Sequence, residues 1–140
     1  MDWRDGVRVM RAAALAEARR APAAGGRATV FDFAGSSGQQ TWIGTVTLPA
    51  GANTGPHHHG RHEVAVYVVS GRSQIRWGEQ LEFAAEIGPG DGVYFAPFVP
   101  HQELNLDSKV PVEFLVVRSD GARIAEKLDL VPAQMPETVV

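Results

Sequence analysis

The chain has 140 residues, of which 44% are hydrophobic, a formal net charge of -3 and no cysteine. A chain of this length buries about 68% of the surface that its unfolded form exposes, so one domain can hold its own core without disulfide bonds. The slightly acidic balance offers no basic surface for phosphates, which argues against a nucleic-acid partner. Residues 1–5 are charged where a secretion signal needs an apolar run, and no run approaches the roughly 20 apolar residues of a membrane span. We therefore expect a cytoplasmic protein with no membrane partner.

The first third of the chain combines an Ala-rich segment with two strand-forming runs. Residues 7–20 can be read as a short strand that continues into a helix, and Pro22 with the glycines at 25–26 ends either one. β-branched and aromatic residues then fill 28–33 and 41–48, on either side of a Gly-Ser-Ser-Gly sequence. These two runs predict strands that are joined by a flexible loop at 35–38.

The middle of the chain repeats short strand signals, and Gly, Pro, Asp or Asn separates most of them. The runs lie at 63–70, 73–77, 81–87, 92–95, 102–106 and 112–117. Such spacing is typical of an all-β sandwich or barrel. Beyond 120, Pro132 and Pro136 interrupt the alternation, so we expect a partly ordered tail that packs on a partner subunit. The predicted organisation is an N-terminal extension at 1–27 (a strand or short helix), a barrel at 28–120 and a C-terminal tail at 121–140.

Two spaced sets of residues carry the chemistry of the chain. The first set is Gly51, His57, His59 and Glu63, and the second is Gly90, His101 and Asn105. On an extended segment His57 and His59 project from one face while His58 points to the other, so His58 is not a predicted ligand. Imidazole and carboxylate groups that converge in a chain without cysteine predict a divalent metal site with nitrogen and oxygen ligands.

These sets resemble the two motifs of the cupin superfamily. Residues 51–63 follow the first motif, Gly-x5-His-x-His-x3-Glu. Residues 90–105 keep the first glycine, the histidine and the asparagine of the second motif, but Ala96 and Phe98 replace its inner proline and glycine. The chain is therefore similar to small, single-domain, stand-alone bacterial cupins. The resemblance implies an all-β double-stranded β-helix, a jelly-roll-like barrel with a short N-terminal extension, and one bound divalent metal ion. The implied metal ligands are His57, His59, Glu63 and His101.

The choice of the third ligand depends on how the residues before Gly71 are counted. The first cupin motif places a glycine seven residues after its glutamate, where this chain has Ser70. Counting back from Gly71 in steps of two favours His62. Counting forward from His59 favours Glu63, if a β-bulge after Glu63 absorbs the extra residue. We prefer Glu63, because bulges are common at barrel rims and beside active sites, and we assign His62 to the surface or to orienting a ligand.

Further charged residues lie close to the two motifs. By alternation Glu103 shares the face of His101, which makes Glu103 the candidate catalytic acid or base. A solvent-facing strand carboxylate is the alternative interpretation of Glu103. Arg72 and Arg76 follow the first motif, and they either meet an anionic substrate or protect a sheet edge.

The resemblance implies a metal but no single reaction. Our first hypothesis is an enzyme that uses zinc, nickel, manganese or iron as a Lewis acid on a small oxygen-rich or carbonyl substrate, in isomerase, cyclase or lyase chemistry. The second is an iron-dependent dioxygenase, since the same ligands suit iron. The third is a non-catalytic module that binds a metal or a small molecule. Because an open barrel leaves strand edges to cover, we also expect a homodimer.

Overall fold

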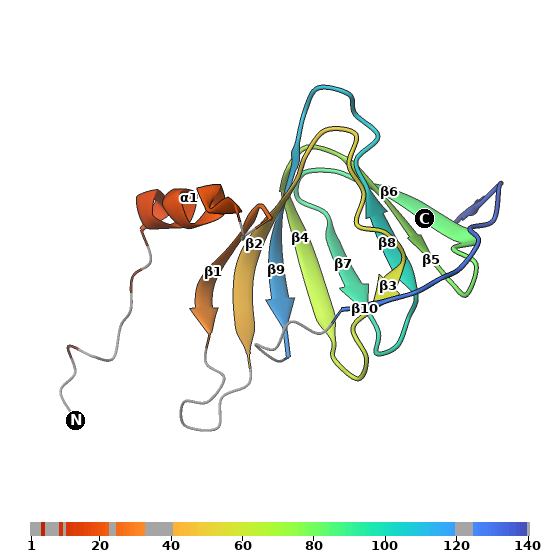
Figure 1. Cartoon of the computed structure of the whole chain (residues 1–140), viewed down its shortest axis with the longest axis horizontal. Coiled ribbons are helices and arrows are strands. Elements are labelled where there is room, and N and C mark those ends of the chain that lie inside the picture. Colours follow the sequence, from red (N-terminus) through yellow and green to blue (C-terminus); the bar gives the residue numbers. More distant parts are fainter. Residues whose placement is uncertain are drawn as a thin grey trace.

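The computed structural model describes residues 4, 9, 11–22, 25–32, 41–119 and 125–139 (Figure 1). Its described helix is α1 (Ala12–Arg20). The first sheet contains β1 (Arg27–Asp32), β2 (Trp42–Leu48), β4 (Val64–Ser70), β7 (Gly92–Phe95) and β9 (Val112–Arg118). The second sheet contains β3 (His57–His58), β5 (Ser73–Trp77), β6 (Phe83–Ile87), β8 (His101–Leu104), β10 (Glu126–Lys127) and β11 (Glu137–Thr138). The strand orders are β1-β2-β9-β4-β7 and β10-β3-β8-β5-β6-β11, which confirms the predicted all-β double-stranded β-helix.

The hydrophobic core lies between the two sheets and follows from period-2 alternation along the strands. In β4 the side chains of Val64, Val66 and Val68 are at most 5% exposed, whereas Tyr67 on the other face is 48% exposed. The inner residues of β2, β5, β6, β7 and β9 complete this core. Its buried members are Trp42, Leu48, Val64, Val66, Val68, Ile75, Ile87, Phe95, Val112, Phe114 and Val116.

Helix α1 is attached to the outside of the first sheet by a polar contact. None of its residues is buried, but the guanidinium of Arg19 donates hydrogen bonds to Glu113 Oε1 at 2.7 Å and to Thr45 Oγ1 at 3.4 Å. The Ala-rich part of 7–20 is therefore helical. Residues 7, 8 and 10 of the expected strand, and the expected loop at 35–38, lie outside the described residues. None of the described segments forms a helix long and apolar enough to cross a membrane.

The C-terminal segment packs on its own barrel over the described residues 125–139. β10 pairs antiparallel with β3, and β11 runs parallel to β6. The guanidinium of Arg76 connects this segment to the barrel. It donates hydrogen bonds to the carbonyl of Leu81 in the barrel (2.7 Å) and to the carbonyl of Ala133 in the C-terminal segment (2.6 Å). Arg76 is therefore a structural residue here. The tail expected from the sequence contributes two short strands to the second sheet.

Candidate metal centre

Three histidines meet where β3 and β8 pair. His57 in β3 lies directly opposite His101 in the register of these strands, and His59 follows one residue after β3. The ring centroids of His57 and His101 are 4.3 Å apart, and one ring nitrogen from each of the three histidines lies within 4.8 Å of the others. The structure thus brings together three of the four predicted ligands in a group that can hold a metal ion.

Backbone hydrogen bonds fix the proton positions of two of these imidazoles. Nδ1 of His57 lies 2.8 Å from the Gly55 carbonyl, and Nδ1 of His101 lies 3.0 Å from the Val99 carbonyl. Because a carbonyl oxygen only accepts, each Nδ1 carries the proton and each Nε2 keeps its lone pair. Within the described part of the structure, the buried Nε2 of His101 has no hydrogen-bond partner. Such a buried acceptor is costly unless something coordinates it, so a divalent metal ion fits this group.

The surroundings of His101 keep its imidazole neutral. Burial, together with the neighbouring His57, lowers the pKa of His101 from 6.5 to about 4. The ring of Phe95 stacks on His101 with centroids 3.9 Å apart and an angle of 18° between the planes. A neutral imidazole is the form that binds a metal ion.

Glu103 is the carboxylate that lies beside this group. It is on the same face of β8 as His101, and its side chain is 14% exposed. Its Oε2 lies 3.9 Å from Nε2 of His57, and its Oε1 lies 4.0 Å from Nε2 of His101. The Thr54 hydroxyl donates to Oε2 at 3.0 Å and accepts from the backbone N–H of Glu103 at 3.1 Å. Thr54 therefore holds one carboxylate oxygen and leaves Oε1 facing the histidines.

The structure places Glu63 outside the histidine group. Its side chain is on the exposed face of the first sheet, where the hydroxyl of Tyr94 donates a 2.7 Å hydrogen bond to Oε2 of Glu63. This bond and the neighbouring negative charge raise the pKa of Tyr94. The sequence motif predicts ligation by Glu63, whereas this position favours the opposite, and the Glu63→Gln variant decides between the two.

The position of the bulge in β4 explains the orientation of Glu63. The register of β4 against β9 shifts between Val68 and Ser70, next to Gly71. From His62 to Val68 the alternation is unbroken, so His62 turns inward with the valines and Glu63 turns outward. His62 is 8% exposed, and its Nδ1 lies 3.5 Å from the hydroxyl of Ser119. His62 packs at the end of the barrel and is not part of the histidine group among the described residues.

His58 points away from the group, as the alternation predicts. Its Nδ1 accepts a 2.9 Å hydrogen bond from the N–H of Gly60, and its Nε2 lies 3.3 Å from Oε2 of Glu126. His58 therefore offers a natural control for substitutions of its neighbour His57.

A comparison with known protein families decides the identity of this barrel. The family model described as a cupin domain matches residues 44–118, which is more than half of the chain. This chain is a cupin. A search of curated proteins finds no match.

Solved structures agree with this cupin in fold. The cupin 2 domain-containing protein from Halorhodospira halophila is 23% identical, with a TM-score of 0.63 over 74% of this chain and 68% of that one. The polyketide cyclase RemF from Streptomyces resistomycificus is 20% identical, with a TM-score of 0.62 over 79% and 73%. The DMSP lyase DddQ from Ruegeria pomeroyi DSS-3 is 22% identical, with a TM-score of 0.52 over 61% and 41%. At these identities the likeness shows the fold alone.

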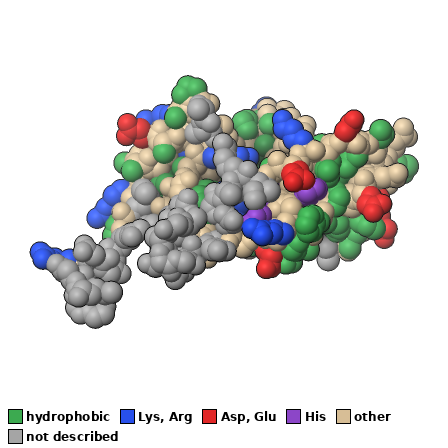
Figure 2. All heavy atoms as spheres, turned by 60° about the horizontal axis from the view of Figure 1, so that its bottom comes forward, with side chains coloured by type: hydrophobic (Ala, Val, Ile, Leu, Met, Phe, Trp, Pro, Cys, Tyr) green, Lys and Arg blue, Asp and Glu red, His purple; other side chains and the backbone are tan. Residues whose placement is uncertain are grey.

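The histidine group opens into a cavity of about 520 Å³ between the first sheet and the β3 edge of the second. Apolar walls come from Trp42, Phe114 and Val116, while His57 and Glu103 supply polar groups on the opposite side. Figure 2 shows histidine, basic and acidic side chains gathered on this end of the cupin barrel. Apolar walls combined with polar groups that converge in one cavity are typical of a small-molecule site.

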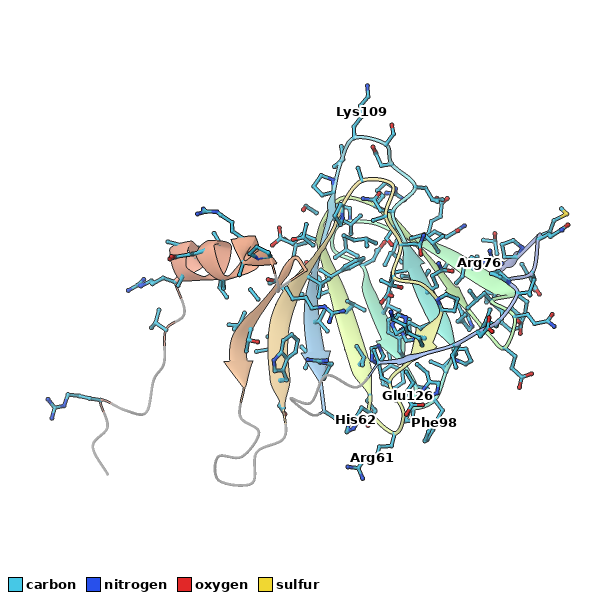
Figure 3. All side chains as sticks on the ribbon, viewed as in Figure 1. Arg61, His62, Arg76, Phe98, Lys109 and Glu126 are labelled. Atoms are coloured by element: carbon cyan, nitrogen blue, oxygen red, sulfur yellow. The ribbon has the colours of Figure 1, made fainter. Side chains whose placement is uncertain are left out.

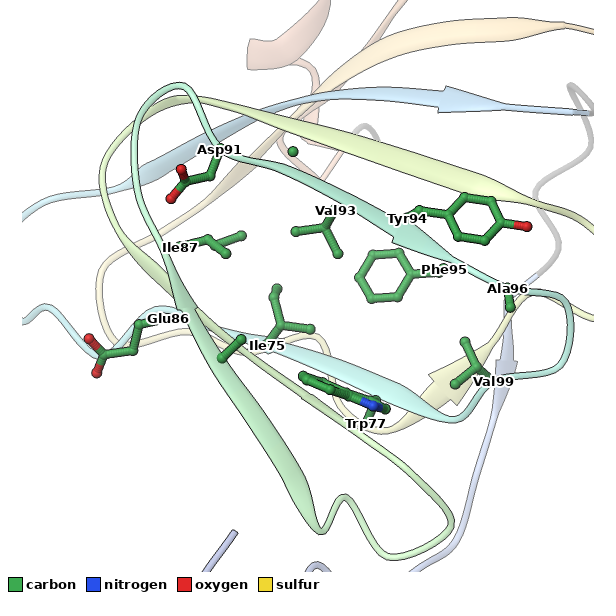
Figure 4. A pocket seen from close by; sticks show the side chains of 12 residues that line it. Ile75, Trp77, Glu86, Ile87, Asp91, Val93, Tyr94, Phe95, Ala96 and Val99 are labelled. Atoms are coloured by element: carbon green, nitrogen blue, oxygen red, sulfur yellow. The ribbon is translucent and has the colours of Figure 1, made fainter. Parts of the chain in front are cut away.

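A larger cavity of about 630 Å³ lies on the other side of the core, between β5, β6 and β7. Figure 4 shows Ile75, Val93, Phe95 and Val99 pointing into it, with Trp77 along one wall. Phe95 is the link between the two sides, because its ring also stacks on His101. This cavity contains none of the grouped histidines, so the smaller one is the candidate site.

Sequence reasoning missed the basic residues of the metal cavity. Arg27, Arg118 and Lys127 all line it, whereas Arg72 lines a separate small pocket. The sequence could have indicated the position of Arg118, because residues 114, 116 and 118 alternate with the same spacing and therefore share the inner face of the strand. The predicted strand ended one residue too early, at 117. Lys127 has no such signal, because its strand contains two residues.

Proposed function

We propose that this cupin is an enzyme that uses one divalent metal ion, bound by His57, His59 and His101, on a small oxygen-rich or carbonyl substrate. Isomerase, cyclase or lyase chemistry fits such a site. The observation that carries the proposal is the buried Nε2 of His101, which has no hydrogen-bond partner among the described residues and faces two further imidazoles.

The metal ion would supply Lewis acidity that polarises a substrate oxygen. The residues of the chain supply the remaining functions. The carbonyls of Gly55 and Val99 orient the imidazoles of His57 and His101, and the apolar walls of the cavity suit the carbon skeleton of a substrate. Glu103 is the proposed catalytic base, taking up a substrate proton at Oε1 while Thr54 holds Oε2.

The fold relatives support an enzyme over a non-catalytic binding module. Their names include a polyketide cyclase and a lyase, and each name belongs to that protein. Aldol-type cyclisation and β-elimination of a carbonyl compound both involve removal of a proton next to the carbonyl group, which an electrophile and a base in one cavity promote. The histidine group and Glu103 offer this pair in the present chain.

The deciding experiment is elemental analysis of protein purified without a His tag or nickel resin. Wild type, His57→Ala and the control His58→Ala should be compared after reconstitution with zinc, iron, nickel or manganese. We expect one metal ion per chain in wild type and in His58→Ala, and none in His57→Ala. Iron in preference to the other metals would redirect the assays to dioxygenase activity. Absence of metal from reconstituted wild type would overturn the proposal.

A further inference from the structure

The C-terminal segment brings a lysine to the mouth of the metal cavity. In the register of β10 against β3, Lys127 lies opposite His57 and Glu126 lies opposite His58. Glu126 and His58 form the outward pair, with 3.3 Å between their charged atoms. Lys127 shares the other face with His57 and lines the cavity.

The ammonium of Lys127 is available to a ligand. Among the described residues it makes no ion pair and no hydrogen bond, and the carboxylate of Glu103 in the same cavity does not pair with it. Glu103 is instead held by Thr54. The positive charge of Lys127 therefore remains at the cavity mouth.

Basic groups outnumber acidic groups on the described walls of this cavity. Arg27, Arg118 and Lys127 face the single carboxylate of Glu103, although the whole chain carries a net charge of -3. Arg118 comes from β9 of the first sheet, where its guanidinium carbon lies 4.1 Å from the ring centroid of Trp42. Lys127 comes from the second sheet, so the two cations approach from opposite walls. Clustered charge of one sign in a cleft attracts ligands of the opposite sign.

We infer that the substrate is a small carboxylate with a second oxygen donor, such as a 2-oxo or 2-hydroxy acid, and that Lys127 binds its anionic group. This inference rests on the proposed function, because the second oxygen donor is the group that the metal would polarise. The cavity volume of about 520 Å³ accommodates a compound of this size, and its apolar walls suit the carbon body. Lys127 thereby selects anions over neutral compounds of the same shape.

The chain contains a matched control for this lysine. Its other lysine is Lys109, which Figure 3 shows at the opposite end of the barrel from Glu126, the neighbour of Lys127. Lys109 and Lys127 are both exposed. Substituting either one removes one surface charge, but only one of them lines the cavity.

The test is a titration of zinc-loaded protein with pyruvate, with neutral pyruvamide as the comparison compound, followed by NMR chemical shifts. The variants are Lys127→Gln, Lys109→Gln and Lys127→Arg. We expect Lys127→Gln to weaken pyruvate binding about tenfold, Lys109→Gln to match wild type, and Lys127→Arg to restore binding to within about threefold. Added salt should weaken pyruvate binding more in wild type than in Lys127→Gln. The same spectra report whether each variant is folded.

Two results would overturn the inference. One is equal binding of pyruvate and pyruvamide to wild type, and the other is equal binding of pyruvate to wild type and Lys127→Gln. Failure of the proposed function has a different signature, since wild type would then hold no metal. In that case a titration of the metal-free protein still tests the role of Lys127. Pyruvate binding that depends on Lys127 would support an anion site without a metal, and binding that does not depend on it would overturn the inference.

Discussion

The hydroxyl of Tyr94 donates a 2.7 Å hydrogen bond to Oε2 of Glu63 on the exposed face of the first sheet. This contact directs the carboxylate toward solvent, whereas the three grouped histidines lie on the inner side of the barrel. The carboxylate beside the histidines is that of Glu103. The two glutamates therefore have different expected roles, and matched substitutions separate them.

Substitution of Glu63 by Gln should leave metal binding unchanged. The variant loses an exposed hydrogen bond to Tyr94, and no group near the histidines changes. Metal affinity can be measured by competition with a chromophoric chelator. A loss of affinity of about tenfold or more, which corresponds to about 1.4 kcal/mol, would show that Glu63 is a ligand as its motif position predicts.

Substitution of Glu103 by Gln should abolish turnover without releasing the metal. The amide keeps the shape of the side chain and its contact with Thr54, but it cannot accept a proton at Oε1. Loss of a general base typically lowers kcat by about 10²- to 10⁴-fold. Steady-state assays on any substrate found for the wild type, with elemental analysis of the same sample, check this expectation. Unchanged kcat would remove Glu103 from the mechanism.

Removal of the metal should lower the thermal stability of the wild type but not that of His101→Ala. A ligand that binds only the folded state stabilises it, by about 2.7 kcal/mol when the free ligand is at 100 times its Kd. Melting curves with zinc and with a chelator give the difference for each protein. An equal zinc-dependent shift in His101→Ala would mean that the metal binds elsewhere.

Asn105 holds together the loops at the far end of the barrel. Its side chain is 1% exposed, and Nδ2 lies within 3.2 Å of the carbonyl oxygens of Leu48, Pro49 and Val110. Asn105→Leu removes the donor from one buried and two partly buried carbonyls, so we expect the free energy of unfolding to fall by about 2–4 kcal/mol. Urea denaturation measures this change. A loss below about 0.5 kcal/mol is typical of a surface substitution and would contradict the structural role of Asn105.

Asp107 should make stability depend on pH in the acidic range. Hydrogen bonds from the backbone N–H groups of Lys109 and Val110 lower the pKa of Asp107 from its ordinary 3.8. Its stabilising contribution is therefore present above that ordinary value and is lost as the pH falls through the lower pKa of the folded state. The melting temperature of wild type should exceed that of Asp107→Asn at neutral pH and converge with it in strong acid. A difference that is constant with pH would contradict this assignment.

Local alternation was sufficient to predict the longer strands, but not the two-residue strands β3, β10 and β11. It also predicted the shared face of His57 and His59. It could not decide between His62 and Glu63, because the answer depends on where the bulge lies. Pairing of β4 with β9, which is distant in the sequence, sets the bulge at Val68–Ser70. The two motifs brought His101 into the prediction because they reflect a shared three-dimensional arrangement.

The C-terminal part of the site was beyond local reasoning for a different reason. Pro132 and Pro136 interrupt the alternation around it, and a two-residue strand has no period to detect. Pairing of β10 with β3 is a tertiary contact that gives Lys127 its position. A single sequence contains no signal for such a contact.

The segment that carries Lys127 lies beyond residue 118, where the match to the cupin domain ends. Arg27 lies before residue 44, where that match begins. The three grouped histidines thus lie within the matched stretch, whereas two of the three basic residues that line the cavity, Arg27 and Lys127, lie outside it. For protein engineering, the proposed role of Lys127 makes the terminal segment a candidate for exchange: we expect replacement of 125–139 to change which anions bind, while the three histidines stay in the sequence.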